Sequence, residues 1–303
     1  MPEILCIGET MTLVAPVDAT PLASADLFTL HMGGAESTVA LYLAEQGHSV
    51  AWASSVGNDP LGKRIVDEIA AHGVDTSHVT ILDSAPTGVY FKDPDDGATT
   101  VHYYRRGSAA SLMSPATLDG LPLREVSIVH VSGINAGLSD SCAAMMTALF
   151  DLCEGSPTRI SFDVNYRRGV WEVERASPIL LDLARRADIT FVGRDEAAAL
   201  WGTTDAHSIA ALIGTEHRRA GTLVVKDGDV GATEFTSSGT VFVAAHTVDV
   251  VEVVGAGDAF AAGYLSGLSS GKDAHGRLSM GHDLAARALS STNDFVPAAG
   301  LDA

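Results

Sequence analysis

Short apolar runs alternate with amphipathic segments along most of the chain. Residues 3–8 and 189–193 are apolar runs that end in glycine, which is typical of buried strands. Residues 34–47 carry apolar side chains at helical spacing before a terminal glycine, which predicts a helix. Further strands are predicted at 49–57, 127–133, 159–165 and 222–228, and further helices at 60–74, 141–155, 177–187, 195–202 and 258–292. This alternation predicts an α/β fold with a mostly parallel sheet and helices on both faces.

The middle of the chain follows a different pattern. Residues 87–93 and 99–106 are rich in β-branched and aromatic side chains, and the turn formers of DPDDGA separate them. They predict a hairpin, because no helical pattern interrupts them. We therefore expect a small appended sheet, formed by segments of about 11–31 and 87–106, within one domain over residues 1–303. A second hairpin is predicted after the strand that ends at Gly228, reaching nearly to VEVVG.

Composition and charge exclude several kinds of partner. The chain carries 38 acidic and 19 basic residues, and its net charge of −19 repels nucleic acid and anionic lipid. No apolar run reaches the roughly 18 residues of a membrane span, and no basic leader precedes an apolar core at the N-terminus. Three cysteines without metal-type spacing fit a reducing compartment. We expect a cytoplasmic protein that binds neither nucleic acid nor membrane.

The stretch VEVVGAGDAF, residues 251–260, places two glycines and an aspartate at the start of an apolar helix. Successive backbone amides in such a turn can point at one anion, and Gly255 and Gly257 permit close approach of a phosphate. Asp258 would lie in the first helical turn, where a carboxylate can accept a proton from an attacking hydroxyl. Phosphoryl transfer needs both features. Taken alone, the stretch fits equally well a packing turn in which Asp258 caps the helix.

Two clusters of arginines and polar groups stand out in this acidic chain. In HYYRRGSAA, Tyr103 and Arg105 share one strand face and can offer a phenol and a guanidinium to an anionic sugar, or form ordinary hairpin pairs. In FDVNYRRGVW, the polar residues Asp163, Asn165 and Arg167 follow a buried strand. A parallel sheet places ligand-binding groups there, although Asp163 can also simply cap a turn.

Weaker signals lie elsewhere. The glycines of GGAEST, residues 33–38, can let the backbone approach a polyhydroxyl ligand or can begin a helix. Glu196 can hold a metal through water or cap its own helix. Lys226 can reach a nucleotide phosphate, and Gly228 and Gly231 after it can serve that site or turn a hairpin. A dinucleotide fingerprint and a P-loop are excluded, because GAGDAF lacks a third glycine and GLSSGKD has the wrong spacing.

Four segments in order resemble the signatures of the ribokinase-like (PfkB) carbohydrate kinases. They are GGAESTVALYLAEQG, SVGNDPLGKRIVDEIAAHGVDTSHV, VVKDGDVGA and VEVVGAGDAF. The resemblance spans nearly the whole chain. It implies a Rossmann-type domain with a small β-sheet lid, and phosphorylation of a sugar hydroxyl by ATP with Mg²⁺. It also implies a homodimer or higher homo-oligomer that associates through the lid.

The resemblance also assigns roles by position. Asp258 matches the catalytic base, and Gly255, Ala256 and Gly257 match the anion hole. Further residues match the nucleotide, metal and sugar sites of the family. The residues that match the nucleotide site are Asn165, Lys226, Gly228, Gly231, Gly255 and Gly257. Glu196 matches a residue that holds the metal through water. The residues that match the sugar site are Gly34, Tyr90 and Asp294.

Within the family, YYRRGSAA and FDVNYRRGVW most resemble 2-keto-3-deoxygluconate kinases, in which the residues matching Tyr103, Arg105 and Arg167 hold the acidic sugar. The expected reaction moves the γ-phosphoryl group of ATP to the primary hydroxyl of that sugar acid, with Arg167 also stabilising the transferring charge. The alternatives are another sugar kinase of the family, a fructokinase or ribokinase, and a non-catalytic sugar- or nucleotide-binding regulator.

The chain also departs from the family pattern. Thr38 replaces an asparagine of the first signature, and Gly193 replaces the asparagine of an N-x-x-E element that ends at Glu196. Glu252 and Val253 stand where Asp-Thr is common, in a region that often forms a monovalent-cation site. The sequence therefore leaves open whether a monovalent cation is used.

Overall fold

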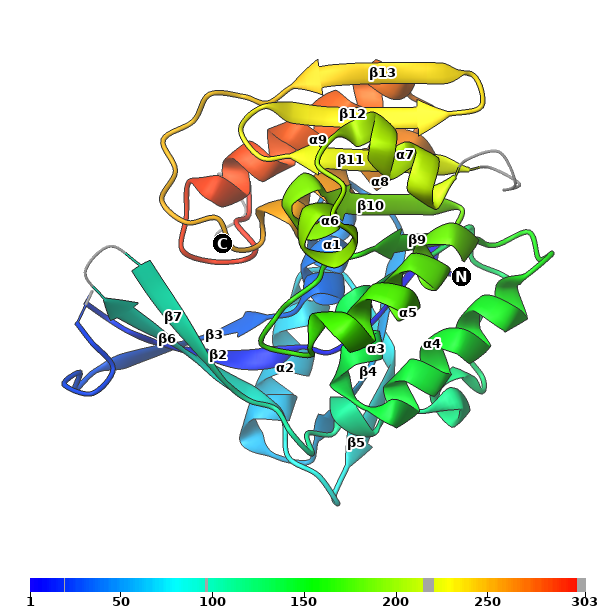
Figure 1. Ribbon diagram of the computed structural model, residues 1–303. Helices are drawn as coiled ribbons and strands as arrows, with labels where there is room; N and C mark the ends of the chain where they lie inside the picture. The colour runs from blue at the N-terminus through cyan, green and yellow to red at the C-terminus, as the bar shows by residue number, and fades with distance from the viewer. Residues whose placement is uncertain (19, 96–97, 215–220, 299–303) are drawn as a thin grey trace.

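The computed structural model describes all residues except 19, 96–97, 215–220 and 299–303 (Figure 1). Its largest element is a nine-stranded sheet. In spatial order the strands are β13 (Gly239–Ala244), β12 (Gly231–Thr236), β11 (Thr222–Asp227), β10 (Ile189–Gly193), β9 (Arg159–Asp163), β8 (Ile128–Ser132), β1 (Ile4–Ile7), β4 (Val50–Gly57) and β5 (Asp75–Leu82). All neighbours from β11 to β5 pair in parallel, whereas β12 and β13 are antiparallel additions at one edge. The predicted, mostly parallel sheet is confirmed.

Helices cover both faces of this sheet, as the sequence predicts (Figure 1). Alternate residues of β1 show why: Leu5 and Ile7 enter one core, and Ile4 and Cys6 enter the other. One face carries α3 (Gly133–Leu138), α4 (Asp140–Cys153), α5 (Val173–Arg186), α6 (Arg194–Trp201) and α7 (Ala206–Ile213). The other carries α1 (Ala35–Glu45), α2 (Pro60–Ala71), α8 (Ala256–Ser269) and α9 (Ala274–Leu289).

A separate four-stranded sheet projects from the large one (Figure 1). Its order is β3 (Phe28–Gly33), β2 (Met11–Pro16), β6 (Val89–Asp95) and β7 (Ala98–Tyr104). The strands β2 and β6 pair in parallel, and the other two pairs are antiparallel. The small sheet predicted from segments 11–31 and 87–106 is therefore present, although residues 19, 96 and 97 lie outside the described part.

The two faces of this small sheet differ. Met11, Leu13 and Tyr90 are buried on the face that we name the inner face. On the outer face, Leu30 pairs with Val14, and Val14 pairs with Phe91. This outer face remains largely apolar and open to solvent, since Phe28, Leu30 and Tyr104 are exposed.

Some predictions from the pattern were incomplete or wrong. The edge strand β5 and the helix α7 were not predicted. The second hairpin ends at Ala244 rather than near residue 254, because residues 245–250 have no strand partner and adopt no regular structure. Helix α2 was predicted, and its sequence explains its start: Asp59 accepts hydrogen bonds from the Leu61 and Gly62 amides, with Pro60 in the first turn.

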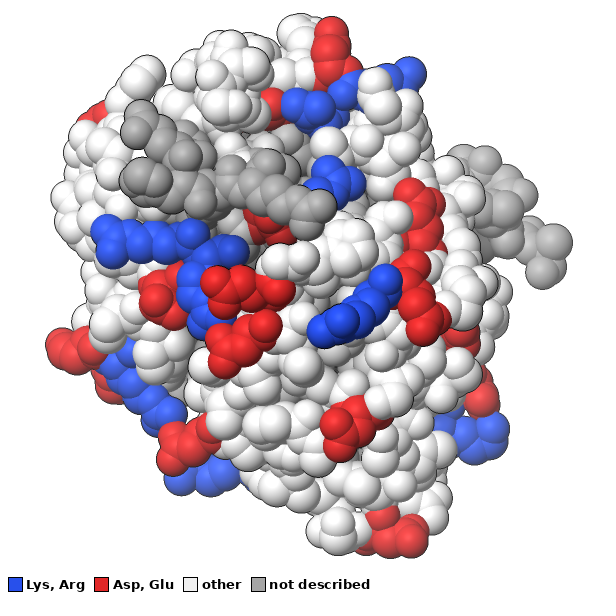
Figure 2. Space-filling view, turned by 90° about the vertical axis from the view of Figure 1, so that its right-hand side faces the viewer, with Lys and Arg blue, Asp and Glu red and all other residues white. Residues whose placement is uncertain are grey.

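Charged side chains of both signs lie close together on the surface that Figure 2 shows. On the face shown in Figure 2, lysines and arginines are interspersed with acidic side chains. Arg175 pairs with Asp140, and Arg186 pairs with Asp151. Within the described ranges, no helix combines the length and apolarity that a membrane crossing requires. Cys6, Cys142 and Cys153 are free and buried.

Candidate active site

Polar groups converge where three neighbouring parallel strands end. Asp163 closes β9 and pairs in register with Phe191 of β10, while Gly193 closes β10 and pairs with Lys226 of β11. Because the strands run in parallel, their carboxyl ends meet at one edge of the sheet. The start of α8 reaches the same edge, because the Lys226 ammonium lies 3.3 Å from where a Cβ on Gly257 would be.

Asp258 lies in the first turn of α8, next to Asn165. The Asn165 amide Nδ2 donates to Asp258 Oδ1 at 3.2 Å. The backbone of Asn165 has a φ of 36°, which is uncommon for a residue other than glycine and holds its amide at this position. Burial, followed by the charge of Asp163, raises the pKa of Asp258 to about 7. A carboxylate with such a pKa can exchange a proton near neutral pH.

Lys226 joins Asp258 to the rest of the cluster. Its Nζ donates to Asp163 Oδ2 at 2.7 Å. Burial alone would lower the pKa of Lys226, but the carboxylates of Asp163 and Glu196 outweigh burial and raise it. Lys226 is therefore a permanent cation beside the first turn of α8, and it lowers the pKa of Asp258.

The start of α8 is a glycine turn followed by a helix N-terminus, and its use as an anion hole stays a prediction. Gly255 precedes the helix with a φ of 81°, in the left-handed region that favours glycine. Helix α8 begins at Ala256, and the first amides of a helix have no acceptor within it. These amides and the helix dipole favour an anion at the position that Asp258 and Lys226 border.

Gly255→Ala tests whether this turn must be glycine. A methyl group there would lie 2.9 Å from both Cα and the carbonyl oxygen of Asp294, so backbone must shift. We expect a lower melting temperature and a kcat reduced about tenfold, since the amides of the turn would be displaced. The control is Gly271→Ala, because Gly271 has a φ of 70° but open space around it. That variant should cost only about 1 kcal/mol of stability and leave kcat unchanged. Equal effects of the two variants on kcat would contradict the role of the turn.

Glu196 accepts two backbone hydrogen bonds at the same edge. The Gly193 amide donates to its Oε2 at 2.7 Å and the Tyr166 amide to its Oε1 at 2.9 Å. Burial raises the pKa of Glu196, against the opposing charge of Lys226. The carboxylate thus fixes the loop that carries Asn165 to the end of β10. In the described part of the chain, no group of three or more His, Cys, Asp or Glu side chains is arranged to hold a metal ion by itself.

The two predicted sugar-binding arginines have different surroundings. Arg105 forms an ion pair with Glu9, and its side chain is 13% exposed. Ser108 also donates to Glu9, at 2.8 Å. Arg167 is exposed and, among the described residues, has no carboxylate at ion-pair distance, yet its charge lowers the pKa values of Asp258 and Asp294. Arg167 is therefore the guanidinium that remains available to an anionic ligand.

Two tyrosines on the inner face of the small sheet approach this edge. The rings of Tyr90 and Tyr103 stack with their centroids 5.8 Å apart. The Tyr103 ring lies 3.7 Å from where a Cβ on Gly169 would be, next to the loop of Arg167. A Cβ on Gly33 would lie 2.0 Å from Tyr90 Oη and 2.7 Å from Asp294 Oδ2. The inner face thus meets both the Arg167 loop and the segment after α9.

Two buried polar atoms at this edge have no hydrogen-bond partner within the described ranges. Among the described residues, Asp294 Oδ1 and Asn165 Oδ1 make no hydrogen bond, although both residues are buried. Burial raises the pKa of Asp294 to about 6. An unsatisfied buried polar atom costs roughly 1–3 kcal/mol, so both atoms suit contact with a polar ligand.

Three predicted glycines have evident structural roles. Gly228 lies in the exposed turn after β11 with a φ of 50°. A Cβ on Gly231 would lie 2.3 Å from the carbonyl oxygen of Val243, and one on Gly34 would lie 2.4 Å from the carbonyl oxygen of Glu9. Packing therefore requires glycine at positions 231 and 34, and their predicted ligand contacts stay predictions.

Sequence reasoning missed the roles of three charged residues near the site. Glu9 follows Gly8 directly, so its position after the first strand was a usable signal. Lys92 lies two residues after Tyr90 and so shares its strand face, which also could have been noticed. Glu252 was seen only as a departure from the family pattern, and the structure pairs it with Lys92.

Comparisons with known proteins identify the family of this chain. The family model described as pfkB family carbohydrate kinase matches residues 1–297. The chain is 31% identical over 242 residues to the 2-dehydro-3-deoxygluconokinase of Thermoproteus tenax. The aligned region covers 78% of this chain and 72% of that protein. It is 30% identical over 233 residues to the 2-dehydro-3-deoxygalactonokinase of Haloferax volcanii, covering 76% and 73% of the two chains.

A solved structure extends the match to the fold. The crystal structure of a PfkB protein from Polaromonas sp. JS666 is 32% identical and has a TM-score of 0.89, covering 96% of this chain and 97% of that one. The resemblance inferred from the four sequence motifs is therefore confirmed. With its family match over nearly the whole length and a carboxylate at the glycine-rich start of α8, this chain belongs to the pfkB family of carbohydrate kinases.

Proposed function

We propose that this sugar kinase transfers the γ-phosphoryl group of ATP to the primary hydroxyl of 2-keto-3-deoxygluconate, giving the 6-phosphate. The observation that carries the proposal is Asp258, a carboxyl group with a pKa of about 7 at the anion-binding start of α8. The sugar oxygen forms a bond to the γ-phosphorus while the bond between that phosphorus and the bridging oxygen breaks. ADP leaves, and Asp258 takes the hydroxyl proton.

The neighbouring residues supply orientation and charge. Asn165 holds the Asp258 carboxylate by the 3.2 Å hydrogen bond, which directs its free oxygen toward the acceptor hydroxyl. The amides of the 255–258 turn, together with Lys226 and Arg167, stabilise negative charge on the moving phosphoryl group. Asp163 keeps Lys226 in place through their ion pair.

The proposed reaction uses Mg²⁺, which neutralises phosphate charge when it is bound. Magnesium usually keeps several waters and takes one or two carboxylates from the protein, so it needs no preformed protein cage. Glu196 fits that use. Each of its oxygens accepts one backbone amide and retains a second lone pair that a magnesium-bound water can meet.

The acidic sugar is favoured by Arg167. Its guanidinium is exposed, has no carboxylate partner in the described part of the chain and lies within electrostatic reach of Asp258, so it suits a substrate carboxylate. We propose that the inner face of the small sheet acts as a lid, with Tyr90 and Tyr103 over the sugar and Asp294 beside it. A closed lid excludes water and so limits wasteful hydrolysis of ATP.

A kinase for a neutral sugar is the second candidate, and one observation favours it. Glu9 already neutralises Arg105, so of the two predicted arginines only Arg167 lacks a carboxylate partner among the residues that the structure describes. In that case Arg105 does not bind substrate but positions Tyr103. The Cζ atom of Arg105 lies over the Tyr103 ring, 5.4 Å from its centroid.

An ADP-release assay with a panel of sugars tests the proposal. We expect the highest kcat/KM for 2-keto-3-deoxygluconate or its galactonate epimer, and much lower values for fructose and ribose. Preference for a neutral sugar would select the second candidate. If no sugar stimulates ADP release although ATP and sugar bind, the chain is a binding regulator and the proposal fails.

We also propose that two copies pair through the outer face of the small sheet. Its exposed apolar residues include Phe28, Leu30 and Tyr104, and an apolar face of this kind is typical of a protein interface. Leu30→Glu should shift the protein from dimer to monomer in analytical ultracentrifugation. A wild-type monomer, or a Leu30→Glu dimer, would contradict this pairing.

A further inference from the structure

One lysine joins the small sheet to both loops that surround the start of α8. Lys92 lies in β6, and its side chain, like that of Tyr90, is on the inner face. Its ammonium lies 2.8 and 2.9 Å from the two carboxylate oxygens of Glu252, and it donates to the carbonyl oxygen of Thr292 at 2.9 Å. These partners are 160 and 200 residues away in sequence. The Lys92 side chain is only 6% exposed.

The two partners of Lys92 flank the glycine that begins the anion-binding turn. Glu252 precedes Gly255 by three residues, and its backbone is anchored because the Val251 amide donates to the Leu289 carbonyl at 2.8 Å. Thr292 precedes Asp294 by two residues, and the Asp294 backbone packs directly against Gly255. A displacement of either loop would therefore turn the amides at the start of α8.

The atoms around the ammonium form an oxygen cage suited to one positive charge. Two carboxylate oxygens and one carbonyl oxygen face it, and the Asp294 carboxylate is close enough for Lys92 to lower its pKa. Without Lys92, Glu252 would keep a mostly buried carboxylate with no partner, which is strongly unfavourable. Oxygen ligands of this kind also bind small inorganic cations.

We propose that Lys92 is a positioning residue that serves as a built-in monovalent cation, holding the small sheet and the Glu252 and Thr292 loops in the geometry that phosphoryl transfer requires. The wild-type protein therefore has no need of added potassium. Removing the ammonium exposes an oxygen site that free K⁺ or NH₄⁺ can fill. The proposal rests on the proposed function for its kinetic readout alone.

The test compares Lys92→Met with wild type in KCl, NH₄Cl and choline chloride at equal ionic strength. Choline is too large for the vacated site. We expect kcat of the variant in choline chloride to fall about tenfold or more, as for a displaced catalytic turn, and to recover partly in KCl or NH₄Cl. Its melting temperature should rise in the same two salts, because a bound ion stabilises the folded state. Wild-type kcat and melting temperature should be the same in all three salts.

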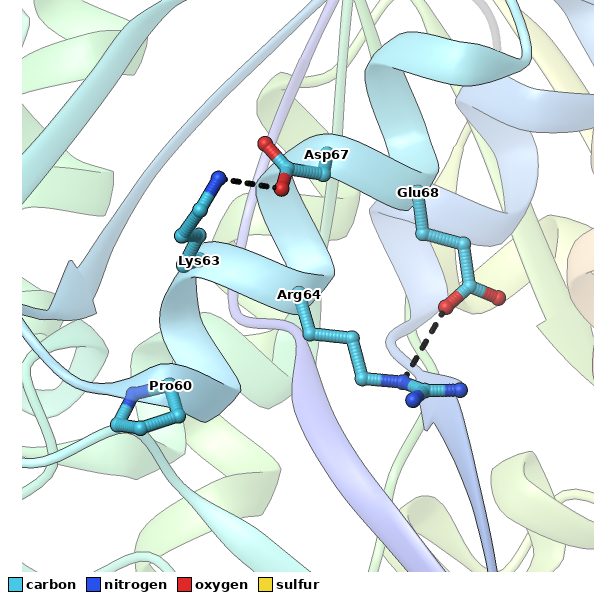
Figure 3. A pocket seen from close by; sticks show the side chains of 5 residues that line it. All are labelled: Pro60, Lys63, Arg64, Asp67 and Glu68. Atoms are coloured by element: carbon cyan, nitrogen blue, oxygen red, sulfur yellow. Dashed lines mark hydrogen bonds and ion pairs between the residues drawn. The ribbon is translucent and has the colours of Figure 1, made fainter.

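Two further variants control the test. Lys92→Met/Glu252→Gln removes the Glu252 carboxylate as well, so it should fold without that unpaired charge and show no response to K⁺ or NH₄⁺. Lys63→Met removes an exposed lysine that pairs with Asp67 at 2.6 Å in a surface hollow on α2, where Arg64 and Glu68 also pair (Figure 3). That variant should behave as wild type.

Three outcomes would overturn the proposal. The first is a Lys92→Met variant with wild-type kcat in choline chloride. The second is a Lys92→Met variant whose kcat and melting temperature do not change with K⁺ or NH₄⁺. The third is a wild-type protein that itself needs K⁺ for activity. If neither the wild type nor any of these variants phosphorylates a sugar, the proposed function fails. The melting temperatures still decide whether Lys92 occupies a cation site, because they require no turnover.

Discussion

Asp258→Asn should reduce kcat by about 10²–10⁴-fold while sugar affinity changes little, because the variant loses a general base but keeps the side-chain shape. An asparagine at this position can still accept the hydrogen bond from Asn165 through its carbonyl oxygen. Steady-state ADP release gives kcat, and calorimetric titration gives the dissociation constant of the sugar. A variant with near wild-type kcat would remove Asp258 from the mechanism.

The same substitution should raise stability at alkaline pH. The pKa of Asp258 rises from 3.8 to about 7 in the folded state, so that state holds the proton more tightly than the unfolded state does. The stabilisation from the protonated carboxyl group therefore declines as pH rises from about 4 to about 7, and it is absent above pH 7. Asp258→Asn avoids the buried charge, so its melting temperature should exceed that of wild type at about pH 8 by more than at about pH 5.

A matched control separates this effect from a general loss of acidic charge. Asp67 on α2 is 62% exposed and pairs only with Lys63 among the described residues. Asp67→Asn should leave kcat and the pH dependence of the melting temperature unchanged. A similar rise in melting temperature in both variants would point to the net charge of the chain rather than to the site.

Arg167→Gln should lower kcat/KM for the acidic sugar by about 10–100-fold, because a hydrogen bond to a charged group contributes about 1.5–3 kcal/mol. The loss for any neutral sugar that turns over should be smaller, since that sugar has no carboxylate to pair with the guanidinium. Arg167 also lowers the pKa of Asp258. Its removal should raise that pKa, so the rising limb of kcat/KM against pH should move to higher pH.

Arg168→Gln is the matched control, because Arg168 is the next residue and is also exposed. Arg167, and not Arg168, is among the main causes of the shifted pKa values of Asp258, Glu196 and Asp294. We expect wild-type kcat/KM and an unmoved pH profile for this variant. If Arg168→Gln matched Arg167→Gln in both readouts, anion recognition could not be assigned to position 167.

The sequence predicted the central strands because each is a short apolar run buried on both faces, as in ILCI and ITFVG. It missed β5, because this edge strand is only partly buried and its sequence DTSHVTIL has few consecutive apolar residues. It placed the second hairpin too far along, because HTVDVVEVV alternates as a strand does while Val250, Val251 and Val253 are exposed. Alternation without a neighbouring strand to supply hydrogen bonds does not make a sheet.

The sequence predicted those parts of the candidate site whose residues lie within a single motif. Asp258, Gly255 and Gly257 are adjacent in sequence, so one glycine-rich turn before a helix placed them. The pairing of Arg105 with Glu9, and of Lys92 with Glu252, joins separate segments through the position of the small sheet. Sequence periodicity gives the face of a strand, but it does not give the distance between two sheets.

The small sheet has a consequence for the order in which the chain folds. One half, β2 and β3, lies between β1 and α1, and the other half, β6 and β7, follows β5. The strands β2 and β6 pair in parallel although they are far apart in sequence. The elements α1, β4, α2 and β5 lie between them along the chain. Loop closure over that separation is costly until those intervening elements are packed. We therefore expect the small sheet to assemble last, on the packed large sheet, and to open first in the folded protein.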